Sequence, residues 1–573
     1  MLAGACFVAI TPFFWWGSPS GHDFEFHMDS WMEVLGQWKY GIIYPRWAAL
    51  AHWGYGEARF LFYPPASWTL GAALGAVLPW KMVPGAYCWI ALLLAGAAMY
   101  RLAREWLAAP DALFAAVFYA LNPYHVLLVY WRSAYAELLA AALLPLLLVC
   151  LLRMNKPCWR PTLWLSLLLA AAWLTNAPAA VMIHYSTAGL AVVFATVGAV
   201  RLRSRSPELR RSVVHTLVRP VVRLLVRTAL AILLGAGLAS FYLLPAIYEQ
   251  KWIDFSQILS LGVRPQDNFL FTTMADPDHN RFNLLVSTIT LVEIGVLALA
   301  IWGSRRWRAK RAEVGIADNI LWILLSAWGI GSVLLMLSVS YLLWQYLPVL
   351  RFVQLPFRWL LCMNAALAIL LAMMAAERST STSTWISRLL ASAVLLGAVI
   401  LAGYRNQPPW WETASDVRQM TDAIDDGSGY EGTDEYVPAG VDPYELNKEL
   451  PRISDAAGAP VPSEILAWGP TEKHFTVRPT TAQNLIVHLF NYPAWDVVVN
   501  GKPSRTGKTD VTGLIVIPIA AGDNDVRIHF RRTIDRFIGD IVSLISPAVF
   551  AVAWMKTKMK MKTQPKTRPK QQV

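Results

Sequence analysis

The sequence has little charge for its length. Only 15% of its 573 residues are Asp, Glu, Lys or Arg, against about 25% in an average soluble protein. Hydrophobic residues make up 56%, and runs such as 91–100, 138–152 and 365–376 carry no charge. Because lipid cannot satisfy an open backbone, apolar segments of about 20 residues cross a bilayer as helices. The composition therefore argues against a soluble enzyme and predicts a multi-pass membrane protein.

Cysteine is also scarce. All five cysteines lie in or beside apolar runs, and no two have CxxC spacing: Cys6, Cys88, Cys150, Cys158 and Cys362. The pattern indicates neither a disulfide framework nor a zinc knuckle. No motif for a nucleotide, flavin or haem is present, so the sequence indicates no organic cofactor.

Positive charge is concentrated rather than spread. The formal net charge is +12, and the basic residues gather in 201–227, 305–311 and the tail 556–570. Each cluster adjoins an apolar run, as the positive-inside rule expects of cytoplasmic loops. The excess charge therefore indicates membrane topology and not nucleic-acid binding.

The apolar runs predict a mainly α, polytopic bundle of about 13 spans, with boundaries at about 2–16, 66–80, 85–100, 111–129, 137–152, 161–175, 180–200, 228–247, 284–303, 318–343, 357–376, 386–404 and 538–555. The first run lacks a basic n-region, so we interpret it as a retained span. With the basic clusters inside, 248–283 and 405–537 lie outside, and the charge of loop 17–65 places that loop outside too. These placements disagree by one crossing between residues 66 and 200, which requires either a half-span or an additional span there.

Residues 405–537 differ from the rest of the chain. They hold 19 acidic residues against 13 Lys and Arg. Asn500-Gly501 is a strong hairpin signal, because a type I′ turn needs positive φ at both central residues. We predict a small extracytoplasmic domain, loose and acidic at 412–465 and β-rich from about 470. The domain separates a membrane module, 1–404, from a last span, 538–555, and a basic cytoplasmic tail, 556–573.

The external loop 17–65 combines acidic, basic and aromatic residues. Segment 21–31 reads GHDFEFHMDSW, and 59–65 reads RFLFYPP. If 25–38 is helical, Met28, Trp31, Leu35 and Trp38 share one face, and Asp29 and Glu33 another. Aromatic rings with polar tips favour the headgroup layer. We therefore expect short amphipathic helices lying in the membrane interface.

This layout resembles the GT-C superfamily of membrane glycosyltransferases. Asp23 and Glu25 form an Asp-x-Glu pair directly after the first span, where that superfamily carries its acidic motif. Tyr63-Pro64-Pro65 is similar to the Pro-Pro element that opens the second span in aminoarabinose and protein-mannosyl transferases. Asn122-Pro123, followed by Arg132 and Glu137, resembles their second external acidic site.

Two further resemblances concern bacterial membrane proteins. Segments 492–495, YPAW, and 500–502, NGK, look like the β domain of YfhO-like proteins. Segments 21–31 and 63–65 also resemble proteins labelled 6-pyruvoyl-tetrahydropterin-synthase-related, a label that in our interpretation misdescribes their chemistry.

The GT-C resemblance implies transfer of a sugar from a polyprenyl-phosphate donor to an envelope glycan, lipid or protein, at the outer face of a bacterial inner membrane. An inverting transfer needs a carboxylate base and positive charge on the leaving phosphate. Asp23 is the expected base, with Glu25 and Glu137 as helpers. Three arginines are expected to contact the phosphate and three other residues the substrate: Arg46, Arg59 and Arg132, and Tyr63, His22 and His27. The loop has no Asp-Asp or Asp-Glu doublet, so a divalent metal is left open.

The acidic residues and histidines also have ordinary structural interpretations. Asp23 is a potential helix cap, and Glu25 a first-turn residue favoured by the helix dipole. His22 and His27 are five residues apart, a spacing that suits a shared metal on neither a helix nor a strand. Glu137 lies at the mouth of an apolar helix, where a carboxylate is costly unless it is hydrated or used. The three arginines are candidates for snorkelling to headgroups.

Two rival functions remain. A transporter or flippase of lipid-linked sugars predicts ionisable residues in mid-span, and Glu293, Arg358 and His184 lie in or near apolar runs. A non-catalytic scaffold that binds envelope polymer predicts that the Asp23 loop can be neutralised without effect. Charge concentrated in loops favours the transferase.

Overall fold

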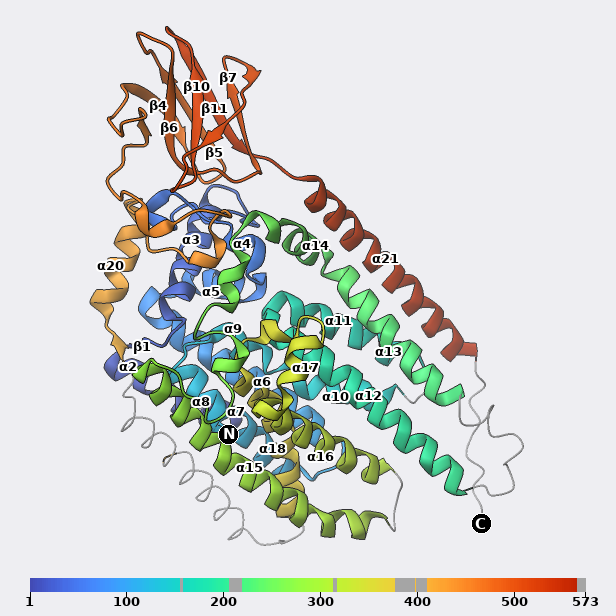
Figure 1. The fold of residues 1–573 in the computed structure, drawn as a ribbon. Coiled ribbons are helices and arrows are strands. Elements are labelled where there is room, and N and C mark those ends of the chain that lie inside the picture. The colour runs from blue at the N-terminus through green and yellow to red at the C-terminus, as the bar shows by residue number, and fades with distance from the viewer. Residues whose placement is uncertain (155–157, 206–218, 313–316, 377–396, 398–409, 564–573) are drawn as a thin grey trace.

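The computed structural model describes residues 1–154, 158–205, 219–312, 317–376, 397 and 410–563. A bundle of helices forms the larger part, and a β domain stands at one end of it (Figure 1). The last helix leaves the β domain and runs back along the outside of the bundle. The chain is a multi-pass integral membrane protein with a C-terminal β domain, as the sequence predicts.

The helices of the described residues are α1 Leu2–Ala9, α2 Pro12–Trp16, α3 Phe24–Lys39, α4 Arg59–Phe62, α5 Pro65–Gly75, α6 Val83–Ala103, α7 Ala109–Ala120, α8 Pro123–Tyr130, α9 Tyr135–Ala140, α10 Leu143–Arg153, α11 Arg160–Thr175, α12 Ala177–Arg205, α13 Arg219–Leu238, α14 Ser240–Glu249, α15 Pro277–Ala312, α16 Ala317–Met336, α17 Tyr341–Tyr346, α18 Leu360–Ala376, α20 Ala414–Asp425 and α21 Ile534–Thr563. Short 3-10 turns join several of them, among them η10, Pro356–Trp359.

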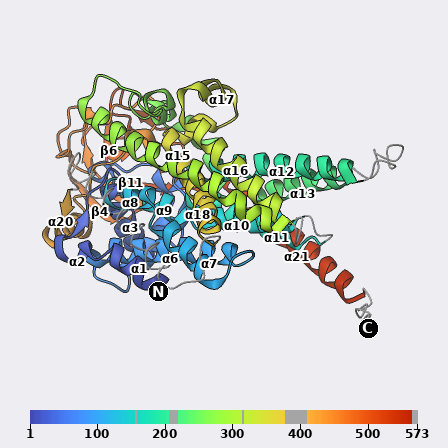
Figure 2. The ribbon, with the colours of Figure 1, turned by 90° about the horizontal axis from the view of Figure 1, so that it is seen from below.

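Seven segments of the described chain are long and apolar enough to cross a membrane: Trp80–Ala103, Ala109–Tyr130, Tyr135–Arg153, Ala177–Val200, Val221–Leu238, Pro277–Trp307 and Pro356–Ala376. A pair bent by 89°, Ile320–Met336 with Ser338–Tyr346, raises the number to eight if it is one span. Seen from below, α12, α13 and α21 project to one side of the molecule (Figure 2). Each of these segments overlaps a span that the sequence predicts, but Val221–Leu238 begins seven residues before the predicted span 228–247 and ends nine residues before the end of that span.

Other predicted spans are shorter or lie elsewhere. The segment predicted at 66–80 is α5, which has 11 residues and is therefore about 16 Å long, half of a hydrocarbon core of about 30 Å. That length fits a half-span, which is one of the two alternatives that the charge pattern leaves between residues 66 and 200. The first apolar run is a 15-residue helical segment interrupted after Ala9. Helix α21 covers the residues of the predicted final span, 538–555, but is not among the segments of the described chain that are long and apolar enough to cross a membrane. The predicted span 386–404 lies outside the described residues except for position 397.

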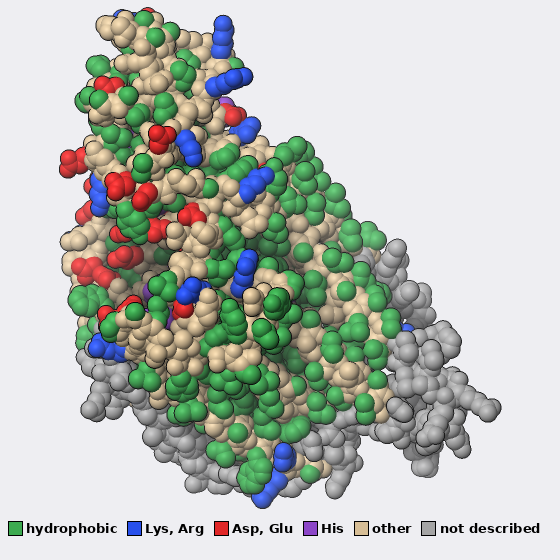
Figure 3. All heavy atoms as spheres, viewed as in Figure 1, with side chains coloured by type: hydrophobic (Ala, Val, Ile, Leu, Met, Phe, Trp, Pro, Cys, Tyr) green, Lys and Arg blue, Asp and Glu red, His purple; other side chains and the backbone are tan. Residues whose placement is uncertain are grey.

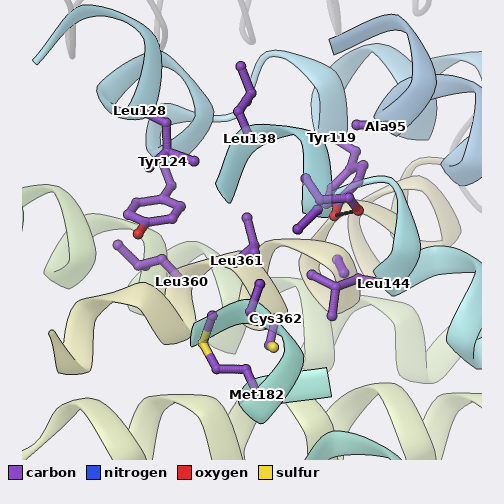
Figure 4. Packing of buried hydrophobic residues seen from close by; sticks show 14 of the residues in the cluster. Ala95, Tyr119, Tyr124, Leu128, Leu138, Leu144, Met182, Leu360, Leu361 and Cys362 are labelled. Atoms are coloured by element: carbon purple, nitrogen blue, oxygen red, sulfur yellow. Dashed lines mark hydrogen bonds between the residues drawn. The ribbon is translucent and has the colours of Figure 1, made fainter. Parts of the chain in front are cut away.

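The bundle core lies around α18, which is buried along almost its whole length. Leu360, Leu361 and Cys362 of α18 extend among side chains of α8, α9, α10 and α12 (Figure 4). A charge on this buried helix would be costly without a partner. None of its 17 residues is charged. Helix α18 begins two residues after Arg358, which lies in η10.

The β domain consists of two antiparallel sheets that share one hydrophobic core. One has the strand order β3-β6-β10-β9 and the other β4-β5-β11-β7-β8. The strands are β3 Ile453–Ser454, β4 Ser463–Trp468, β5 Glu472–Val477, β6 Gln483–Phe490, β7 Trp495–Val499, β8 Lys502–Pro503, β9 Gly507–Lys508, β10 Leu514–Ile519 and β11 Asn524–Phe530. Alternate residues of β5, β6, β10 and β11 point into this core.

The predicted hairpin is confirmed. Asn500 and Gly501 have φ of 51° and 76°, and Val499 pairs with Lys502 across the turn, as a type I′ turn requires. The β region begins earlier than the predicted position near 470, at β3 and β4, and the stretch predicted to be loose contains α20. Strand β4 is exposed on both faces, so its sequence shows no alternation.

The C-terminal domain covers the loop 17–65. Trp47, Tyr55 and Leu61 of this loop belong to the same hydrophobic core as Phe490 and Tyr492 of the β domain. Acidic side chains gather on this part of the surface, over α20 and the segment after it, whereas hydrophobic side chains cover the bundle below (Figure 3). The loop therefore packs between the bundle and the β domain.

Candidate functional site

The start of α3 is fixed by contacts with distant parts of the chain. Strands β1, Ser18–Pro19, and β2, Trp411–Glu412, pair just before it. Gly21 lies so close to the segment after α8 that an added Cβ would be 2.4 Å from the carbonyl carbon of Arg132. The Asp23 N–H donates a hydrogen bond of 2.9 Å to the Arg132 carbonyl oxygen. These contacts place two residues 109 positions apart side by side.

Asp23 stands at the N-cap position of α3, but its carboxylate accepts no hydrogen bond from the helix. Capping therefore does not account for this side chain. Its partners are the imidazole of His22, with Nδ1 2.7 Å from Oδ1, and the guanidinium of Arg132, with Nη2 3.8 Å from Oδ2. The Asp23 side chain is 28% exposed, so one ionisable group of the cluster is in reach of solvent.

Behind Asp23, a buried network holds Arg132. The Nη1 atom of Arg132 lies 2.9 Å from Oε2 of Glu137, and Nε of Arg358 lies 3.1 Å from the same oxygen. The Tyr124 hydroxyl donates to Oε1 of Glu137 at 2.5 Å. Arg132 and Glu137 are 4% and 1% exposed. We refer to Asp23, Arg132, Glu137, Tyr124 and Arg358 as the Asp23 cluster.

Ser133 ties the two halves of this site together. It has a φ of 48°, an unusual conformation for a residue other than glycine. Its hydroxyl donates to the Pro19 carbonyl at 2.8 Å and accepts from the Gly21 N–H at 2.9 Å. Strained residues gather where a site over-determines the backbone. The two hydrogen bonds of this strained residue join the loop before Asp23 to the segment that follows Arg132.

The electrostatics favour an ionised Asp23. Burial acts to raise the pKa of Asp23, but the hydrogen bond and charge of His22, together with the charge of Arg132, outweigh it and hold this pKa below its ordinary value. The hydrogen bond to Asp23 in turn raises the pKa of His22. Asp23 is therefore a carboxylate at neutral pH, able to accept a hydrogen bond or a proton.

His27 and Tyr63 lie in an aromatic cluster beside Asp23. The His27 ring centroid is 5.8 Å from that of Tyr63 and 5.1 Å from that of Tyr135. His27 is 1% exposed, and its Nε2 atom has no hydrogen-bond partner. Burial lowers the pKa of His27 to about 4, so the ring is neutral. His22, by contrast, is exposed, and the two histidines do not share a ligand site.

Glu25 and Arg46 do not join the Asp23 cluster. Glu25 is exposed on the first turn of α3, and no ion pair to it occurs among the described side chains. The guanidinium of Arg46 lies over the Tyr44 ring, 4.3 Å from its centroid, and Nη2 donates to the Phe241 carbonyl at 3.2 Å. Arg46 thus faces α14 and not Asp23.

Arg59 belongs to a second, closed cluster. Its Nε lies 2.5 Å from Oε1 of Glu57, and Nη1 donates to the Ser30 hydroxyl at 3.0 Å. His52 and the Thr433 N–H engage the other oxygen of Glu57, at 3.0 and 2.8 Å. Arg59 is 1% exposed. We refer to these five residues as the Arg59 cluster.

Carboxylates of α3 extend the Arg59 cluster. The Tyr430 hydroxyl donates to Glu33 at 2.5 Å, and burial raises the pKa of Asp29 to about 8. Both acidic residues are buried, so the acidic face of α3 packs inside the protein and is not the solvated face of the amphipathic helix that the sequence predicts. Its charged face meets partners from residues near 430.

Sequence reasoning did not assign Tyr124, Ser133 or Arg358 to the site. Arg358 was noted only as an ionisable residue near an apolar run, and Tyr124 follows the Asn122-Pro123 pair. The ion pair of Arg358 with Glu137 joins segments more than 200 residues apart, and the hydrogen bonds of Ser133 reach Pro19 and Gly21, more than 110 residues earlier. No local pattern reveals such contacts. In the part of the chain that the structure describes, no group of three or more His, Cys, Asp or Glu side chains is arranged to hold a metal ion.

No protein-family model matches the sequence, and no curated protein matches it. Among solved structures, ArnT from Cupriavidus metallidurans bound to undecaprenyl phosphate aligns at 16% identity with a TM-score of 0.39, over 70% of this chain and 63% of that one. An oligosaccharyltransferase from Archaeoglobus fulgidus, in complex with Zn and sulfate, aligns at 13% identity with a TM-score of 0.33, over 76% of this chain and 54% of that one. The chain thus spans less than two thirds of either structure.

Proposed function

We propose that this protein is an integral membrane glycosyltransferase that moves a sugar from a polyprenyl-phosphate donor to an envelope acceptor at the extracytoplasmic face of a bacterial inner membrane. One observation carries the proposal. A partly exposed carboxylate, Asp23, lies 3.8 Å from the guanidinium of Arg132, which is itself held by Glu137 at the start of a membrane span. Base and cation therefore stand together where a lipid carrier presents its headgroup.

The charges of the Asp23 cluster suit this chemistry. Arg132 and Arg358 are both within 3.1 Å of a single carboxylate oxygen of Glu137. Asp23 is the looser second partner of Arg132, so a donor phosphate can compete for that guanidinium. Guanidinium groups pair well with phosphate, and Glu137 with Tyr124 keeps them in place. Arg59, which Glu57 neutralises, is not needed for this role.

In the proposed reaction, the acceptor hydroxyl oxygen attacks the anomeric carbon of the donor sugar. The bond from that carbon to the phosphate oxygen breaks, and its electron pair leaves with the polyprenyl phosphate. The proton of the hydroxyl passes to Asp23, which its low pKa keeps ionised beforehand. Arg132 and Arg358 stabilise the negative charge that grows on the departing phosphate.

The test is transfer of radiolabel from polyprenyl-phosphate sugars in membranes that contain the full chain. Asp23→Asn should lower the rate by about 10²–10⁴-fold, because general-base catalysis contributes that much, while insertion and folding persist. Asp425→Asn makes the same charge change at an exposed position of α20 and should retain activity. Full activity of Asp23→Asn would remove Asp23 from the mechanism. Label that crosses the membrane without reaching an acceptor would favour transport.

A further inference from the structure

Three ionisable residues of the bundle lie in or near apolar runs of the sequence, and they have different environments. Arg358 pairs with Glu137, and Nδ1 of His184 bonds to the Ala180 carbonyl at 2.7 Å. Glu293 has neither a counter-charge nor a backbone partner among the described residues. It lies near the middle of the span Pro277–Trp307 and is 3% exposed.

Among the residues that the structure describes, Asn364 makes the one hydrogen bond to Glu293. Its Nδ2 donates to Oε2 of Glu293 at 3.2 Å, from α18 to the neighbouring helix α15 (Figure 1). Asn364 is fully buried. Two atoms of the pair, Oε1 of Glu293 and Oδ1 of Asn364, have no hydrogen-bond partner within the described part of the chain. Both are acceptors, so the pair lacks a hydrogen-bond donor.

The pair adjoins a pocket. Between α15, α18 and the junction of α7 with α8, the pocket has a volume of about 10 Å³, room for about one water molecule. Besides Glu293, it is lined by apolar side chains: Phe118, Pro123, Ile289, Val292, Val296 and Leu367. These residues supply neither a positive charge nor a donor to the carboxyl group.

Titratable groups on the helices around Glu293 are engaged elsewhere. Arg358, just before α18, pairs with Glu137, and the ring of His125 on α8 bonds to the Ala120 carbonyl. Cys362 on α18 lies next to Ser186. An ionised carboxylate left in this apolar environment would lack compensation, which is costly within a bilayer.

We infer that Glu293 and Asn364 form a proton-binding site in the membrane interior. A proton taken from water converts the Glu293 carboxylate into a carboxylic acid, and its O–H supplies the donor that the unpartnered acceptors lack. No other bond changes, and the site becomes electrically neutral. The inference does not depend on the proposed transfer reaction, because Glu293 and Asn364 make no contact with Asp23 or its partners in the described structure.

The first experiment treats membranes that contain the full chain with dicyclohexylcarbodiimide, which adds to protonated carboxyl groups in apolar surroundings. Peptide mass spectrometry should find the label on Glu293 and not on Glu249, a buried carboxylate that Arg536 holds through two hydrogen bonds. Labelling should fall as pH rises, because the proton is lost, and should vanish in Glu293→Gln. Labelling that increases with pH would overturn the inference.

The second experiment tests the inference without the reagent, in case the reagent cannot reach Glu293. The infrared spectrum of the wild type minus that of Glu293→Gln should contain the carbonyl stretch of a protonated carboxyl group. Asn364→Ala should retain this band and shift it, because the acid loses its amide partner. The shift also serves if the Gln variant does not fold. Absence of the band at every pH, in the wild type and in Asn364→Ala, would show that Glu293 is ionised and overturn the inference.

Discussion

The Asp23 cluster and the Arg59 cluster arise from the same loop and use the same residue types, yet only one leaves a charge accessible. In the Arg59 cluster, Glu57 is fully buried and meets a guanidinium, an imidazole and a backbone N–H. In the Asp23 cluster, the corresponding strong partner of the arginine is Glu137, and Asp23 remains 28% exposed at 3.8 Å.

The difference shows that the availability of a charge depends on how many partners surround it. Burial costs each ion much of its hydration, and only close pairing compensates for that loss. Glu57 and Arg59 neutralise each other's charge, so their role is to stabilise the fold. Arg132 is shared between a buried carboxylate and an exposed one, so its second partner can be exchanged for a ligand.

The largest expected effect comes from opening the closed cluster. Arg59→Met leaves Glu57 buried without its guanidinium and should lower the free energy of unfolding by about 3–5 kcal/mol, measured by chemical denaturation in detergent. Arg101→Met is the matched control, because the ion pair of Arg101 with Glu105 is solvent-exposed and worth about 0–1 kcal/mol. Activity per folded molecule should persist in Arg59→Met. A loss as large as that of Asp23→Asn would return Arg59 to the phosphate site.

The next largest effect is expected from a substitution that displaces part of the Asp23 cluster without changing a charge. In Gly21→Ala the new Cβ meets the Arg132 backbone at 2.4 Å, which should move Asp23 away from Arg132. A misplacement of about 1 Å can lower a rate by about 10²-fold, and the radiolabel assay would measure it. Gly501→Ala, at a φ of 76° with nothing within 4 Å, should cost about 1–2 kcal/mol of stability and no activity. Equal rates for both variants would contradict the proposed importance of the Gly21 contact.

A smaller effect tests the link between the two halves of the site. Ser133→Ala removes two hydrogen bonds, to Pro19 and Gly21, each worth about 0.5–1.5 kcal/mol. Stability should therefore fall by about 1–3 kcal/mol in thermal unfolding. Ser133→Gly loses the same bonds but tolerates the φ of 48° better, so it should be the more stable of the two. The reverse order would show that Ser133 stores no backbone strain.

The smallest effect concerns pH. His22 helps to hold the pKa of Asp23 below its ordinary value. In His22→Ala that pKa should rise, so Asp23 takes up its proton at a higher pH and the acid limb of the pH–rate profile moves upward. The contribution of the His22 contact to stability is present at low pH and is lost as pH rises through the raised pKa of His22. An unchanged acid limb would separate His22 from the function of Asp23.

Local signals in the sequence were sufficient for much of the fold. Apolar length located the eight candidate spans, because lipid constrains composition directly. The turn Asn500-Gly501 was predicted correctly, because a type I′ turn has a local sequence signal. Strand β4 was missed because neither of its faces is buried, and α3 was misjudged because the partners of its acidic face lie about 400 residues later in the chain.

The residues of the site were predicted in part, because some of them have local sequence signals. Asp23, Arg132 and Glu137 were all selected from the sequence, and the structure brings them together. Whether Arg59 or Arg132 is available for a ligand could not be predicted, because each arginine is preceded or followed by a glutamate, Glu57 and Glu137. Only the fold shows that the first pair is sealed by Thr433 and that the second adjoins an exposed Asp23.

The covering of loop 17–65 by residues near 411–433 has a consequence for biogenesis. The contact of Glu57 with Thr433 and the pairing of β1 with β2 can form only after the later partner has been synthesised. At synthesis rates of about 5–20 residues per second, more than 370 intervening residues take roughly 20–75 s to appear. During that interval the loop has no lid, and a half-made chain presents its carboxylates and arginines unassembled. A ribosome-bound fragment that stops before residue 411 should therefore be membrane-inserted but inert.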